Sequence, residues 1–83
     1  MAQDDKHEHT IHYKVDGENE TTTEKVLTPI QIMTNAGMDP SANYLEQLEG
    51  HDVISYKDNP GQEIQMRDGM RFLTKPIGPM PVS

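Results

Sequence analysis

The hydrophobic pattern near the start of the chain has a period of two. Apolar and polar residues alternate over 11–15 (IHYKV), which predicts a strand with one buried face. Asp16-Gly17 follows as a hairpin signal, although the turn can extend to Asn19. The β-branched run 21–23 suits a return strand. We therefore expect a β-hairpin over residues 9–26.

The period then becomes helical. Thr28 can cap a helix, and Pro29 suits its first turn. Gly37 stands where a left-handed C-terminal cap belongs, and Asp39-Pro40 follows as a stop. The pattern predicts a short helix over about 28–36. So short a helix needs a sheet to pack against.

The second half of the chain reads as strands separated by turns. Gly50, Gly61 and Gly69 each lie in a turn-like segment. The expected strands or extended segments are 44–48, 53–56, 63–66 and 70–74. The residues expected to be mostly buried are Ile11, Tyr13, Val15, Val26, Ile32, Met33, Ala36, Ile64 and Phe72.

This order of elements predicts a two-layer α+β domain over residues 9–74. A mixed four- to five-stranded sheet would carry one short helix packed on one face. The first and last strands can lie parallel at the centre with right-handed crossovers, which is the order of a β-grasp. Residues 1–8 are expected to form a disordered leader, and residues 75–83 a flexible tail.

The composition and net charge of the chain exclude several classes of function. The 83 residues are 33% hydrophobic, carry a formal charge of −7 and include no cysteine. A chain without a basic stripe is not expected to bind nucleic acid or an anionic membrane. The absence of cysteine excludes disulfides, thiolate metal sites and cysteine nucleophiles. With no apolar leader or membrane-length segment, the sequence predicts a cytoplasmic monomer.

Several motifs together resemble the prokaryotic multi-ubiquitin domain, a bacterial ubiquitin-like family. They are the Thr28 helix start, Ile32-Met33, Ala36-Gly37-Met38, Asp39-Pro40, and Gly69 with Phe72 on the closing strand. The resemblance covers about residues 10–75, in one copy of the domain where the family name suggests several. It implies a ubiquitin-like β-grasp and a protein modifier. Such a modifier is adenylated at its C-terminus by an activating enzyme, passed to a conjugating enzyme and sometimes trimmed by a metallopeptidase.

A modifier role would make the tail the working part. Ubiquitin-like modifiers usually end in two glycines, whereas this tail holds the single glycine Gly78 followed by Pro79. If Gly78 is the mature end, residues 79–83 must be removed. The alternatives are that Ser83 or another tail residue is the true end, or that the tail is never conjugated. In that last case the chain would be a non-covalent β-grasp adaptor that uses its sheet face or an edge strand.

Other candidate sites follow from single residues. Leu45, Leu48 and Met70 are candidates for an apolar partner-binding patch on the sheet, while Arg71 and Lys75 offer charge for docking beside the tail. The spacing His7, His9, His12 resembles a metal site, but a polar leader explains it better. Ser41, His51 and Ser55 lie in no nucleophile motif, and so small a domain has little room for a deep pocket. We expect no enzymatic activity, cofactor or metal.

Overall fold

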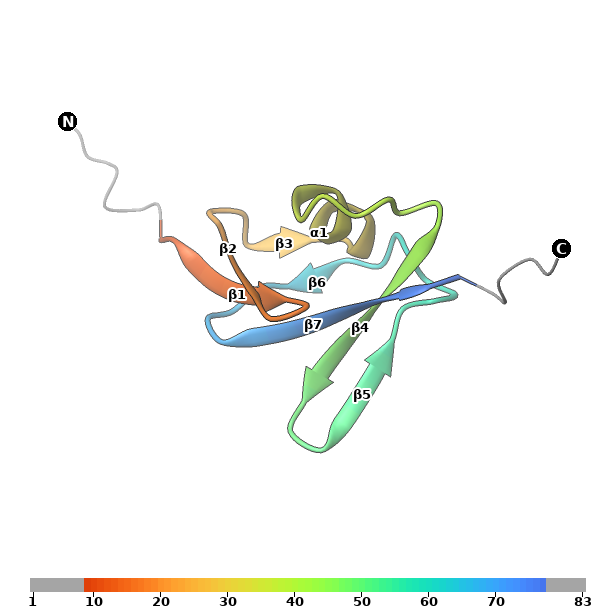
Figure 1. Ribbon diagram of the computed structural model, residues 1–83. Coiled ribbons are helices and arrows are strands. Elements are labelled where there is room, and N and C mark those ends of the chain that lie inside the picture. The colour runs from red at the N-terminus through yellow and green to blue at the C-terminus, as the bar shows by residue number, and fades with distance from the viewer. Residues whose placement is uncertain (1–8, 78–83) are drawn as a thin grey trace, which may run out of the picture.

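The computed structural model describes residues 9–77 as an α+β domain with a mixed five-stranded sheet and one short helix (Figure 1). The single helix of residues 9–77 is not long and apolar enough to cross a membrane. The elements in chain order are β1 (Ile11–Val15), β2 (Glu18–Thr22), β3 (Val26–Leu27), α1 (Pro29–Asn35), β4 (Asn43–Glu49), β5 (Asp52–Ser55), β6 (Ile64–Gln65) and β7 (Met70–Pro76).

The large sheet has the strand order β2-β1-β7-β4-β5. The first and last strands are parallel neighbours, with Tyr13 opposite Met70 and Val15 opposite Phe72. All other pairs in this sheet are antiparallel. The expected parallel pairing of the first and last strands is therefore confirmed.

The hairpin is shorter than the sequence predicts. Asp16 and Gly17 alone form the turn, with φ of 53° and 83°, and the turn does not extend into β2. A two-residue turn with positive φ at both positions matches the twist of the flanking strands. The expected limit at residue 26 was wrong, because β3 leaves the hairpin and pairs with β6 in a separate two-stranded sheet.

The helix forms as expected from its capping residues. The Thr28 hydroxyl accepts the Gln31 amide at 3.2 Å, and the Gln31 side chain accepts the Thr28 amide at 2.9 Å. This capping box satisfies two backbone donors that the helix leaves free. Gly37 then takes φ of 82°, the left-handed conformation that ends many helices.

The core lies between the five-stranded sheet and the layer made by α1, β3 and β6 (Figure 1). The Phe72 ring is 1% exposed and meets the Tyr13 ring edge-on, with centroids 6.0 Å apart. Seven of the nine expected core residues are buried, but Val26 and Ala36 are only partly so. The hydrophobic core also holds residues outside those nine: Leu27, Leu45, Tyr56, Met66 and Met70.

The last strand is longer than the expected 70–74. Asn43 on β4 pairs with Pro76 on β7, and the amide of Ile77 donates to the carbonyl of Ala42 at 2.9 Å. Lys75 and Pro76 therefore belong to the sheet, not to a tail that starts at residue 75. The leader 1–8 and the residues from 78 onward lie outside the described residues.

Replacing Phe72 with alanine tests this core. The change removes a buried ring and leaves a cavity, so Phe72→Ala should lower the free energy of unfolding by about 3–5 kcal/mol. Val53→Ala is the matched control, because that side chain is 57% exposed and should lose far less. Urea denaturation measures both, and Phe72→Leu provides a folded reference if the alanine variant does not fold. A loss below about 1 kcal/mol for Phe72→Ala would contradict the assigned packing.

Candidate functional site

One face of the five-stranded sheet carries no helix or strand from the described residues. We call it the open face. Strand alternation and the pairing register place alternate residues on it, because directly paired side chains share a face. Its members are His12, Lys14, Asn19, Thr21, Tyr44, Glu46, Leu48, Val53, Ser55, Arg71, Leu73 and Lys75.

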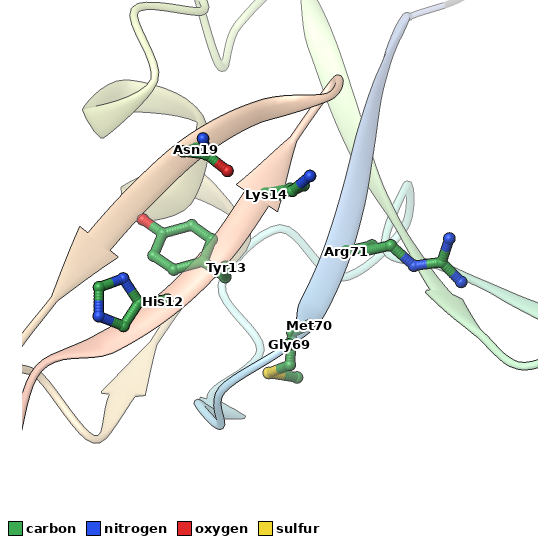
Figure 2. Close-up of a pocket in the computed structure, with 7 residues that line it drawn as sticks. All are labelled: His12, Tyr13, Lys14, Asn19, Gly69, Met70 and Arg71. Carbon is green, nitrogen blue, oxygen red and sulfur yellow. The ribbon is translucent and has the colours of Figure 1, made fainter.

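A shallow groove of about 220 Å³ lies at the β2-β1-β7 side of the sheet (Figure 2). Three strands supply its polar lining: His12 and Lys14 come from β1, Asn19 from β2 and Arg71 from β7. Figure 2 shows Lys14 beside β7, with the Arg71 side chain extending from β7 away from β1. Both cations sit at one level of the sheet, since Lys14 is paired with Arg71 in the register.

The turn that precedes β7 contributes Gly69 to the lining of this groove. Gly69, with φ of 88°, donates its amide to the His12 carbonyl at 2.8 Å. In return the His12 amide donates to Asp68 Oδ1 at 2.8 Å. Two reciprocal bonds thus fix the start of β7 against β1.

Asp68 also contacts a histidine ahead of β1. Nε2 of His9 lies 3.1 Å from Asp68 Oδ2. The His12 backbone bond, and after it the His9 side-chain bond, hold the pKa of Asp68 below its ordinary value. A carboxylate that accepts hydrogen bonds is favoured in its charged form, so the contribution of Asp68 to this turn is greatest while its side chain is ionised.

The structure separates the five expected partner-binding residues. Leu45 is fully buried and Met70 is 9% exposed, so neither belongs to an exposed apolar patch, and their assignment to the surface is corrected here. Both point toward the core because they pair with core-facing neighbours on adjacent strands. Leu48 is half-buried on the open face, and Arg71 and Lys75 are exposed there. The candidate ends Gly78 and Ser83 lie outside the described residues.

Ser41 and Ser55, two of the remaining single-residue candidates, make local hydrogen bonds. Ser41 donates its hydroxyl to Asp39 at 2.7 Å, and the Ser55 hydroxyl accepts the Lys57 amide at 3.2 Å. These bonds cap turns. Across residues 9–77, no group of three or more histidine, aspartate and glutamate side chains could hold a metal ion, and His7 lies outside that range.

Sequence reasoning missed Lys14, His12 and Asn19 as parts of a surface. The signal was present in the alternation of β1, which puts His12 and Lys14 opposite the buried side chains. What was missing is the register, because only the pairing of β1 with β7 brings Lys14 next to Arg71.

Comparisons of the chain with protein-family models, with curated proteins and with solved structures gave no match.

The Asp68 contacts predict a specific pH dependence. Since the folded state lowers the pKa of Asp68, its contribution is present above the unfolded value of about 3.9 and is lost as the pH falls through the lower folded value. The free energy of unfolding should therefore fall more steeply with acidification in the wild type than in Asp68→Asn. Urea denaturation between about pH 6 and about pH 2 measures this difference. Asp58→Asn, in the loop after β5, is the control, and equal slopes for wild type and Asp68→Asn would contradict the prediction.

Proposed function

We propose that this chain is a ubiquitin-like β-grasp protein modifier of a bacterial conjugation pathway. Its C-terminal tail would be activated by an adenylating enzyme, passed to a conjugating enzyme and attached to target proteins, with a metallopeptidase as a possible trimming partner. The proposal draws on the resemblance of the sequence to the prokaryotic multi-ubiquitin domain.

The observation that carries the proposal is the position of β7. The last strand lies at the centre of the sheet, parallel to β1 and antiparallel to β4. The strand order, with a parallel central pair and the helix layer on one face, is compatible with a β-grasp. Because β7 is paired with a strand on each side, residues up to Pro76 are held in the sheet, which would give a rigid support to a reacting segment that follows them.

The chemistry of activation needs only the terminal carboxylate. An oxygen of this carboxylate would attack the α-phosphorus of ATP, forming an acyl adenylate and releasing pyrophosphate. A nucleophile of the enzyme or target would then attack the acyl carbon, and AMP would leave. Gly78, after removal of residues 79–83, and Ser83 are the two candidate reacting ends.

A second function has its own support. The open face is uncovered among the described residues and presents Leu48, Leu73 and Val53 beside cations. Uncovered sheet faces and edges bind partners without covalent chemistry. In this reading the chain is a non-covalent adaptor, and the tail is dispensable. Fold alone does not separate the two functions.

Intact-mass spectrometry of the full chain, incubated with its cognate activating and conjugating enzymes and with ATP and Mg²⁺, tests the modifier function. We expect an adduct through the C-terminus, either at Ser83 or at Gly78 with loss of residues 79–83. Deleting 78–83 should abolish the adduct and leave the melting temperature nearly unchanged, because β7 ends at Pro76.

The control is a second truncation that removes residues 2–8 at the other end of the chain. This variant should still form the adduct. Conjugation that survives deletion of 78–83 would contradict tail activation. The absence of any adduct, together with unchanged partner binding by the tail-deleted chain, would favour the adaptor.

A further inference from the structure

The two faces of the five-stranded sheet differ in the sign of their charge. Three cations and one carboxylate lie on the open face, a net of +2 (3 − 1): Lys14, Arg71, Lys75 and Glu46. The charged residues at core-side positions of the same strands are all acidic: Glu18, Glu20, Glu49 and Asp52. A chain with a formal charge of −7 thus concentrates cations on one surface.

The cations of the open face have no carboxylate partner within the domain. Within residues 9–77 the ion pairs are His9 with Asp68 and Arg67 with Glu49, and neither includes a cation of this face. Lys57 adds a further cation at the edge, where its Nζ lies 5.6 Å from the centre of the Tyr44 ring. These groups therefore remain available to an external anion.

Apolar side chains continue the same line across the sheet. The register places Lys14, Arg71, Leu48 and Val53 side by side on β1, β7, β4 and β5. Neighbouring strands lie about 4.8 Å apart, so the apolar pair begins within about 10 Å of Lys14. Val53 is 57% exposed, and Leu48 and Leu73 are half-buried. A ligand that fits this line has carboxylates at one end and apolar side chains at the other.

We infer that the open face binds an acidic segment of a partner protein, with carboxylates over Lys14 and Arg71 and neighbouring apolar side chains over Leu48 and Val53. Charge complementarity favours an acidic peptide, because its carboxylates are attracted to the cations of the open face. Such a peptide can also carry apolar side chains that pack on Leu48 and Val53, which a simple anion cannot do. A nucleic acid fits less well, since binding a phosphate backbone needs many clustered cations and the open face presents only Lys14, Arg71 and Lys75. The inference holds whether or not the tail is conjugated.

Amide NMR titration of the full chain tests the inference. The probe is a synthetic peptide of three glutamates followed by two leucines, spaced by glycine, and its matched copy carries glutamine in place of glutamate. We expect shifts that cluster at His12, Lys14, Leu48 and Arg71 with the glutamate peptide and weaken as salt is added. The glutamine peptide should give little change. Equal shifts from inorganic phosphate or from a short thymidine oligonucleotide, at the same concentration, would overturn the assignment to an acidic peptide.

Charge-reversal variants test whether the peptide binds at Lys14 and Arg71. Lys14→Glu and Arg71→Glu should each weaken binding of the glutamate peptide by roughly tenfold, because each replaces attraction with repulsion. Lys25→Glu makes the same change in net charge next to β3, outside the open face, and should weaken binding less than about twofold. If Lys25→Glu weakened peptide binding as much as Lys14→Glu and Arg71→Glu, binding would depend on the overall charge of the chain. That result would contradict a binding site on the open face. These results do not depend on adduct formation, so failure here leaves the modifier proposal standing.

Discussion

The parallel pairing of β1 with β7 is the constraint on which the rest of the structure depends. It joins residues near the two ends of the domain, and its entropic cost is met only by the contacts it creates. Phe72 packs against Tyr13 on the core side of this pair. Asp16 closes it, accepting the Thr74 amide at 2.9 Å and the Thr74 hydroxyl at 2.6 Å. Those bonds offset the strain of its positive φ, which aspartate tolerates better than most residues.

The same pairing generates both candidate functional surfaces. It puts the last strand at the centre of the sheet, where β7 has a paired strand on each side. It also brings Lys14 level with Arg71, which gives the open face its cations. The modifier and adaptor proposals therefore depend on the same strand pairing, and they differ in whether the tail is attached covalently or the open face binds a partner.

Local signals in the sequence were enough to predict the hairpin turn and the helix, whereas the parallel pairing of the first and last strands was expected from the order of the elements. Asp16-Gly17 and the Thr28 cap each act through their immediate neighbours, so no knowledge of the fold is needed. The pairing of β3 with β6 could not be predicted, because two-residue strands form only where distant segments meet. The pattern of β4 was ambiguous for a physical reason. Its two leucines, Leu45 and Leu48, are three apart and must point to opposite faces of a strand.

The burial of Gln47 and Tyr56 is a second feature that the sequence alone could not predict. A glutamine in a strand reads as solvent-facing, yet Gln47 is 6% exposed and accepts the Tyr56 hydroxyl at 2.9 Å. A buried polar group is tolerated when a partner satisfies it, and that partner lies on a different segment of the chain. Lys14 was hidden for the same reason: Arg71 and Lys75 were expected as docking charges, but only the register shows that Lys14 lies beside Arg71. The alternation of apolar and polar residues along a strand predicts which face of the sheet each side chain lies on. Only the pairing between strands shows which side chains lie next to each other.

Native-state hydrogen exchange tests the central role of the β1–β7 pair most directly. The amides of β1 and β7 that bond across this pair should exchange most slowly, with a free energy close to that of global unfolding. The edge strands β2 and β5 should exchange faster, because each has one unpaired side. Slowest exchange in the β4–β5 hairpin, with β1 and β7 opening at lower free energy, would contradict the account.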